Sequence, residues 1–175
     1  MNTGFTYVAR PDARVLILGS MPGVASLEAA QYYAHERNVF WMIMERLFSI
    51  PRSLPYASRL EQLTHTGIAL WDVIHRCQRR GSLDTNIVPD SIIVNDFPAL
   101  FSYCPDIHHV FFNGRKAQQL FIQYVVRNQA AMMHDKTLVL LPSTSPAHAA
   151  LSAEQKVSAW SVIRQVLINE KAVAP

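Results

Sequence analysis

The sequence predicts an α/β fold, a three-layer α/β/α sandwich around a central four-stranded parallel sheet. Short continuous apolar runs alternate with segments of helical periodicity along the whole chain. The runs end at glycine, proline or small polar residues, as expected for strands buried on both faces of a parallel sheet. No repeat, low-complexity tract or linker interrupts this alternation. We therefore expect one domain that spans residues 1–175.

Four apolar runs are the expected strands, and they cover residues 15–19, 67–73, 109–112 and 136–141. Helices are expected between and after them. They cover a short turn at 27–33 and then 39–48, 57–66, 96–103, 115–127 and 152–169. Ser152 caps the last helix and Gln155 completes a capping box. Residues 76–90 are polar and are expected to form a loop.

The composition bounds the class of protein. Half of the residues are hydrophobic and 17% are charged, which supports a packed core and argues against disorder. The net charge of +3 suits an anionic partner, and it equally suits an ordinary, slightly basic enzyme. Cys77 and Cys104 show no CxxC spacing, which fits a reducing compartment. We expect a cytoplasmic monomer with neither a signal peptide nor a membrane span.

Several common sites are not supported by the sequence. It contains no GxGxxG, no GxxxxGK[ST] and no GxSxG motif, which disfavours dinucleotide, P-loop and serine hydrolase sites. The histidine spacings do not match a zinc site. We expect no metal and no cofactor.

The loops after the four strands carry the residues of interest, because ligands of parallel sheets bind at the carboxyl ends of the strands. These loops read GSMPG at 19–23, WD at 71–72, NGR at 113–115 and PSTSPAH at 142–148. Serine hydroxyls and exposed backbone N–H groups can bind phosphates, and proline stiffens the loops that carry them. The same residues are also typical of simple tight turns, and composition does not separate these two explanations.

A resemblance extends over residues 15 to 150 in ordered blocks. They are GSMPGVASL from Gly19, QYYAHERNVFW from Gln31, ALWDV from Ala69, RGSLD from Arg80, FNG from Phe112 and LPSTSPA from Leu141. Together they resemble the hypoxanthine-DNA (deoxyinosine) glycosylase branch of the uracil-DNA glycosylase superfamily. The resemblance implies hydrolysis of the N-glycosidic bond of a deaminated base in DNA, after the nucleotide is flipped out of the duplex.

The resemblance also assigns roles. Met21 stands where the wider superfamily carries a water-positioning Asp or Asn, and the resemblance to this branch points instead to Asn38 as the catalytic polar residue. Asp72 and Asp84 are the carboxylates nearest the expected site, and either could contact the sugar cation or the base edge; Asp72 is the one we expect to be catalytic with Asn38. Leu141 replaces the superfamily's frequent histidine. Other roles follow by position: base-binding for Ser20, Met21, Tyr33, Phe40 and Asn113; phosphate-binding for Ser20, Pro22, Gly23, Ser143, Ser145 and Arg115; and a wedge that fills the vacated base stack for Ala147 and His148.

Simpler explanations exist for these residues. Asn38 precedes an apolar helix and could be its N-cap, and Phe40 could be core. Asp72 and Asp84 could cap a strand end and a turn, and Asn113 could support the turn at Gly114. A solvated charged face explains the four arginines that are otherwise phosphate-contact candidates, namely Arg76, Arg79, Arg80 and Arg115.

Three functional hypotheses result. The first is a monofunctional glycosylase acting on hypoxanthine, or on uracil or a mismatched base. The second is a catalytically inactive nucleic-acid-binding module on the same fold, because Met21 replaces the acid. The third is a small-molecule α/β hydrolase, which the missing nucleophile elbow disfavours. The first requires the segments that begin at Gly19, Asn38 and Pro142 to converge on a cavity wide enough for a purine.

Overall fold

A four-stranded parallel sheet lies at the centre of the computed structural model, which describes residues 1–173, the last four by their backbone alone. The strand order is β3 (Ile68–Asp72), β2 (Val15–Gly19), β6 (His109–Asn113) and β7 (Thr137–Leu141). All three neighbouring pairs are parallel. The predicted α/β class and its four strands are confirmed.

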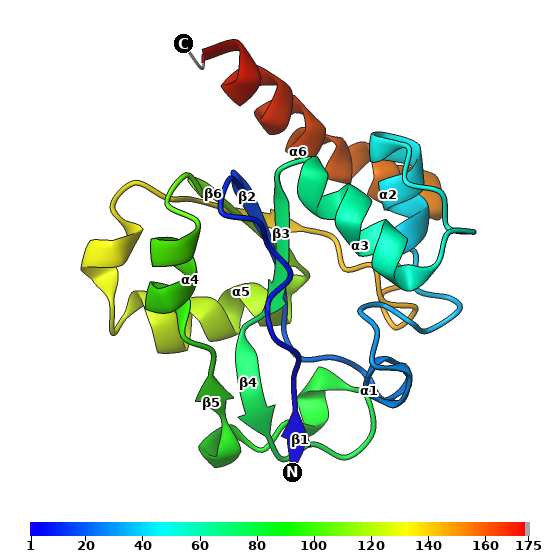
Figure 1. The fold of residues 1–175 in the computed structure, drawn as a ribbon. Helices are drawn as coiled ribbons and strands as arrows, with labels where there is room; N and C mark the ends of the chain where they lie inside the picture. Colours follow the sequence, from blue (N-terminus) through cyan, green and yellow to red (C-terminus); the bar gives the residue numbers. More distant parts are fainter. Residues whose placement is uncertain (174–175) are drawn as a thin grey trace.

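Helices cover both faces of this sheet (Figure 1). Leu16 and Leu18 of β2 point into one core cluster, which includes residues of α4 (Phe97–Tyr103) and α5 (Arg115–Phe121). Val15 and Ile17 point into the other, with residues of α2 (Phe40–Phe48), α3 (Tyr56–His65) and α6 (Ala153–Val173). This alternation along one strand produces the three layers.

Local sequence signals explain the ends of several helices. The Asp96 side chain accepts a hydrogen bond of 3.0 Å from the Ala99 N–H at the start of α4. The predicted capping box of α6 is present: the Gln155 N–H donates to Ser152 Oγ at 3.2 Å, and the Ser152 N–H donates to Gln155 Oε1 at 2.8 Å. The helix predicted at 115–127 begins as α5 and continues as a π-helix, Ile122–Val126.

Two parts of the fold differ from the prediction. The first helix, α1, is Val24–Ala29 rather than 27–33, and it ends where Ala30 adopts a left-handed conformation. A small antiparallel sheet of β1 (Asn2–Thr3), β4 (Ile74–Cys77) and β5 (Ile93–Val94) was not expected. Strands of two residues show no periodicity from which to predict them. Within residues 1–173, three short 3₁₀ helices are also present, at Asp84–Asn86, Pro89–Ser91 and Ala130–Met133.

The register of the central sheet brings the informative loops together. Gly19 pairs with Asp72 at the end of β2 and β3, and Asn113 pairs with Leu141 at the end of β6 and β7. The loops that follow all four strands therefore leave the same edge of the sheet. Among the helices described between residues 1 and 173, none is long and apolar enough to cross a membrane.

Candidate active site

A cavity of about 420 Å³ opens at this edge of the sheet. This volume lies within the range of about 300–1,000 Å³ that ligand pockets occupy. Its walls come from the loops after all four strands and from the segment before α2. The lining residues are Gly19–Gly23, Ala25, Ser26, Tyr32, Tyr33, His35, Arg37, Asn38, Asp72, Ser82–Asp84, Asn113 and Ser143–Ala147. The structure thus brings the segments near Gly19, Asn38 and Pro142 to one opening.

Asp72 reaches the cavity because β2 ends in glycine. A Cβ atom at position 19 would lie 2.4 Å from Asp72 Oδ1, far inside van der Waals contact. Any side chain at position 19 would therefore displace the carboxyl group of Asp72. The carboxyl lies over the backbone of Gly19, and the residue is only 4% exposed.

The carboxyl of Asp72 is held in a poorly solvated, incompletely paired environment. Burial raises the pKa of Asp72 to about 7. Tyr32 favours the ionised form by its proximity, yet no hydrogen bond satisfies either the Tyr32 hydroxyl or Asp72 Oδ2. The hydroxyl of Tyr33, which lies near Asp72 and Asn113, is also buried without a partner. Three residues that line this cavity therefore each carry a buried polar atom without a hydrogen-bond partner.

The two tyrosines are fixed through the Tyr32 backbone and the Tyr33 ring. The Tyr32 carbonyl accepts from Trp41 Nε1 at 2.9 Å, and its N–H donates to the Tyr56 hydroxyl at 2.9 Å. The Tyr33 ring stacks on Phe40 with 4.1 Å between centroids. Phe40 itself is fully buried and does not line the cavity, so it is core behind Tyr33 rather than a direct base contact. Only the other face of the Tyr33 ring is left for a ligand.

Asn38 directly precedes Val39, the N-cap of α2, and it lines the cavity. Its Oδ1 accepts the Phe40 N–H at 3.0 Å at the start of α2, and its N–H donates to the His35 carbonyl at 2.8 Å. A carboxamide oxygen has a second lone pair, which can accept a hydrogen bond from a water molecule. The N-cap predicted at Asn38 is Val39 in the structure, yet the Asn38 side chain still holds the first N–H of α2, and this contact leaves its oxygen able to accept from water.

Asn113 holds the loop after β7 in place. Its Oδ1 accepts the Thr144 N–H at 2.8 Å, and its Nδ2 donates to Thr144 Oγ1 at 2.9 Å. The Thr144 carbonyl accepts the Val39 N–H at 3.1 Å, which ties this loop to the Asn38 segment. Gly114 has φ +98°, and a Cβ there would lie 3.0 Å from the Ser143 Cβ. The side chain of Asn113 borders the cavity, and both ends of its amide are engaged in supporting the turn.

Of the six residues predicted to bind phosphate, five line the cavity, and Arg115 does not. Ser143 Oγ accepts the Ser145 N–H, and Ser145 Oγ accepts the Ala147 N–H, each at 3.2 Å. The two hydroxyls therefore keep their own protons for donation. Arg115 is exposed at the start of α5, outside the lining.

Of the remaining predicted residues, Met21 and Ala147 line the cavity and His148 does not. Met21 is 6% exposed and its side chain belongs to a core cluster, although the residue borders the cavity. Ala147 is exposed at the rim, whereas His148 lies outside the lining. His148 is held by Lys156, whose Nζ donates to the His148 carbonyl at 2.7 Å.

Sequence reasoning missed three features of the site. Tyr32 borders the cavity beside Asp72, and a tyrosine pair in the resembling block was the available signal. Leu83 is 54% exposed and also lines the cavity, as an apolar side chain on the rim. Arg79 was a candidate phosphate contact, but its side chain is buried, so it cannot reach DNA in this conformation. Among the described residues, no group of three or more His, Cys, Asp or Glu side chains is arranged to hold a metal ion.

The comparisons with known proteins agree with this fold and site. Residues 5–164 match the family described as the uracil DNA glycosylase superfamily, and the chain belongs to that superfamily. A hypoxanthine DNA glycosylase of Methanosarcina acetivorans is 34% identical over 164 residues, which cover 93% of this chain and 98% of the relative. A protein of the same name from Methanosarcina barkeri is 38% identical over 115 residues, which cover 65% of this chain and 72% of the relative.

A solved structure is also similar. It is a solution NMR structure of a candidate uracil DNA glycosylase from Methanosarcina acetivorans, 31% identical to this chain. The TM-score is 0.77, and the superposition covers 94% of this chain and 97% of that one. This similarity supports the α/β/α architecture described above.

The burial of Asp72 predicts a distinct pH dependence of stability. Between about pH 4 and pH 7 the folded protein holds a proton on Asp72 that the unfolded chain releases. The free energy of unfolding therefore falls as pH rises through this window. Asp72→Asn should remove this slope and gain up to about 4 kcal/mol relative to the wild type between pH 4 and pH 8.

Urea unfolding at several pH values measures this difference, with the exposed Asp90→Asn as the control variant. Asp84 also has a raised pKa, caused mainly by burial, and its charge helps to raise the pKa of Asp72, so the difference between profiles reports Asp72 together with its interaction with Asp84. If the free energy of unfolding varied with pH in the same way for Asp72→Asn and for the wild type, the raised pKa of Asp72 would be contradicted.

Proposed function

We propose that this protein is a monofunctional DNA glycosylase of base excision repair that hydrolyses the N-glycosidic bond of deoxyinosine. The observation that carries the proposal is the convergence of Asn38 and Asp72 on one cavity of about 420 Å³, between loops suited to phosphates. The names of the two Methanosarcina relatives favour hypoxanthine as the base. One domain, acting as a monomer on DNA in the cytoplasm, is part of the proposal.

The substrate nucleotide must leave the duplex before it can enter the cavity. The hydroxyls of Ser143 and Ser145 and the backbone of residues 20–23 are the proposed phosphate contacts. Tyr33 offers one ring face to the extruded base. Ala147 or Leu83, both exposed at the rim, would fill the space in the stack, and the larger apolar side chain of Leu83 fills it better.

Asn38 positions the attacking water. Its Oδ1 is held by the Phe40 N–H and would accept a second hydrogen bond, from water. An amide does not take up a proton usefully near neutral pH, so Asn38 orients the water without activating it as a base. This favours a dissociative route in which the C1′–N bond breaks first and water then attacks an oxocarbenium-like sugar.

Asp72 acts on the leaving base. Because its pKa is about 7, a large fraction of the carboxyl is protonated near neutral pH and can donate a hydrogen bond. Negative charge develops on the base as the bond breaks, and a donor in a water-poor cavity stabilises it there. Water supplies hydroxide to C1′, and its proton ends on the departing base, so hydrolysis is balanced without a covalent enzyme intermediate.

No lysine occurs in the loops at 19–23, 71–72, 113–115 and 142–148, so a Schiff-base lyase step is not part of the proposal. Uracil, as a smaller deaminated base, is the alternative substrate within the same superfamily. The inactive binding module remains as the outcome in which DNA binds without cleavage. Its motivation is Met21, whose side chain lies in the core instead of offering a water ligand.

A gel assay tests the function. Duplexes that carry one hypoxanthine, uracil, xanthine or mismatched thymine are incubated with the protein and then treated with alkali. We expect the hypoxanthine duplex to be cleaved fastest, and only after alkali. Cleavage without alkali would contradict the monofunctional assignment, and DNA binding with no cleavage of any duplex would show an inactive binding module.

Asn38→Ala tests the catalytic assignment. We expect the single-turnover rate to fall by about 100-fold or more, because the water loses its orienting acceptor. Stability should fall by only about 1 kcal/mol, the typical net value of one lost hydrogen bond. Asn128→Ala, an exposed asparagine outside the cavity lining, is the matched control and should keep the wild-type rate. An undiminished rate for Asn38→Ala would show that the catalytic group lies elsewhere.

A further inference from the structure

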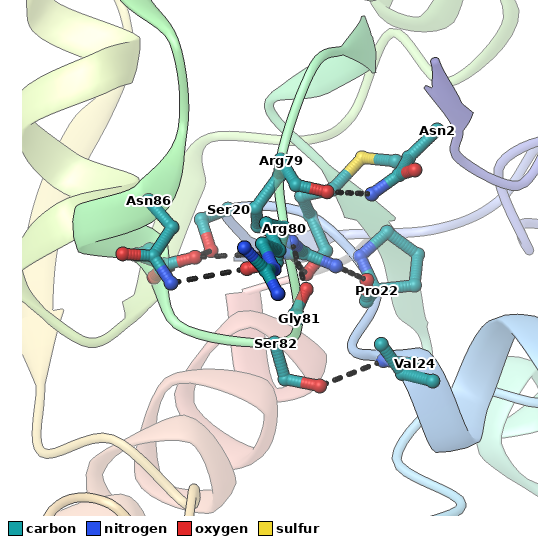
Figure 2. A network of polar contacts seen from close by, with 11 residues as sticks. Asn2, Ser20, Pro22, Val24, Arg79, Arg80, Gly81, Ser82 and Asn86 are labelled. Atoms are coloured by element: carbon teal, nitrogen blue, oxygen red, sulfur yellow. Dashed lines mark hydrogen bonds and ion pairs between the residues drawn. The ribbon is translucent and has the colours of Figure 1, made fainter.

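Arg79 is a cation inside the protein. Its side chain has no exposed surface, and its guanidinium lies between the loop after β2 and the segment that follows β4 (Figure 2). Burying a guanidinium is costly unless its donors are satisfied. The groups that satisfy it therefore indicate what the residue does.

Backbone carbonyls accept the hydrogen bonds of the Arg79 guanidinium. Nε donates to the Gly81 carbonyl at 2.9 Å, Nη1 donates to the Met21 carbonyl at 3.4 Å, and Nη2 makes a short hydrogen bond to the Pro22 carbonyl. The Asp84 carboxylate lies 3.9 Å from Nη1. The planar fork of an arginine can span these separate acceptors, whereas a lysine ammonium cannot.

Two further contacts join the same segments. Ser20 Oγ lies 2.8 Å from both oxygens of Asp84, to which it donates. The Val24 N–H donates to Ser82 Oγ at 2.9 Å, as Figure 2 shows. The loop at 19–23 is thus fixed to residues 79–84 along its length, with Arg79 at the centre of the network.

This arrangement uses every carbonyl of the loop. The Gly19 and Ser20 carbonyls accept from the N–H groups of Val73 and Ile74, and the Gly23 carbonyl accepts from Leu27. Arg79 takes the two that remain, Met21 and Pro22. Within the described chain, no hydrogen bond pairs the N–H of Ser20, Met21 or Gly23. In this loop, which lines the cavity, the carbonyls are all engaged while these three N–H groups have no acceptor within the described residues, the arrangement that suits an anion.

We propose that Arg79 is a positioning residue for DNA binding: it holds the carbonyls of residues 21 and 22 inward, so that the loop presents its N–H groups to a DNA phosphate. The proposal rests on the proposed function, because it takes the ligand of this loop to be DNA. Arg79 itself does not touch the DNA. It acts through the backbone, and the Asp84 carboxylate beside it offsets its charge.

Salt dependence separates this role from a direct phosphate contact. Each phosphate that a side-chain cation neutralises contributes about one to the slope of log K against log salt. The measurement is the equilibrium Kd for a duplex with one deoxyinosine, at several KCl concentrations. Arg79→Met should bind about tenfold more weakly with an unchanged slope, because hydrogen bonds are lost but no counterion-releasing contact is.

Arg79→Lys should recover little of the affinity, since one ammonium cannot span the three carbonyls. Exposed arginines provide the comparison, and Arg80→Met and Arg115→Met should lower the slope wherever those side chains contact phosphate. A wild-type Kd for Arg79→Met, full rescue by lysine, or a slope lowered by about one would overturn the proposal.

Ser82→Ala decides the matter if Arg79→Met does not fold. Ser82 is exposed, and its loss removes only the anchor of the Val24 N–H. We expect binding about threefold weaker at an unchanged slope and an unchanged melting temperature. The wild-type Kd for this variant would overturn the proposal. Ser158→Ala on the surface of α6 is the control.

The two proposals fail in different ways. Wild-type protein that binds the duplex but cleaves no damaged base contradicts the proposed function, while the Arg79 inference is then judged on binding alone. Wild-type protein that cleaves hypoxanthine, with Arg79→Met and Ser82→Ala binding as the wild type does, contradicts only the Arg79 inference.

Discussion

The packing of the Asp72 carboxyl over the backbone of Gly19 is the contact on which the site depends. Two parallel strands end side by side, and only a glycine on one of them leaves room for the carboxyl on the other. Burial then raises the pKa of Asp72 to about 7, which makes a carboxyl a hydrogen-bond donor at neutral pH. The unpartnered hydroxyls of Tyr32 and Tyr33 surround the same point. Unpartnered buried polar atoms are therefore concentrated in residues that line the cavity.

Around the cavity, polar side chains form hydrogen bonds that hold the backbone of the loops in place. The backbone groups that remain unpaired are then the ones proposed to bind the ligand. The amide of Asn113 forms both of its hydrogen bonds with Thr144, and the guanidinium of Arg79 donates to three backbone carbonyls. Asn38 accepts the Phe40 N–H at the start of α2 and also lines the cavity. Rigid loops lose little entropy when they bind, so this arrangement suits the proposed binding of an extruded nucleotide. The stability of the site and its proposed chemistry rest on shared atoms.

The sheet and most helices could be predicted because apolar runs and helical periodicity are properties of neighbouring residues. The run at 15–19 became β2, and the capping box at Ser152 formed as its spacing indicated. The resembling blocks named most of the residues that line the cavity. The small antiparallel sheet could not be predicted, since β1 and β5 have two residues each.

What could not be predicted in the site depended on contacts between distant residues. Arg79 lies in a polar stretch and has the pattern of a solvated cation, yet two of its three carbonyl acceptors stand 57 and 58 positions earlier in the chain. Phe40 carried the residue type of a stacking platform, but packing places Tyr33 in front of it. Met21 occupied a motif position while its side chain joined the core. Sequence proximity to a motif therefore identified the site without fixing which atoms face the ligand.

The most direct measurement is a crystal structure of the protein bound to a duplex with a non-cleavable analogue of deoxyinosine, such as the 2′-fluoro nucleotide. The account predicts an extruded hypoxanthine in the cavity, within hydrogen-bond distance of the Asp72 carboxyl, with the Asn38 amide beside the sugar C1′. A base that stays stacked in the duplex, or that binds away from Asp72 and Asn38, would contradict it.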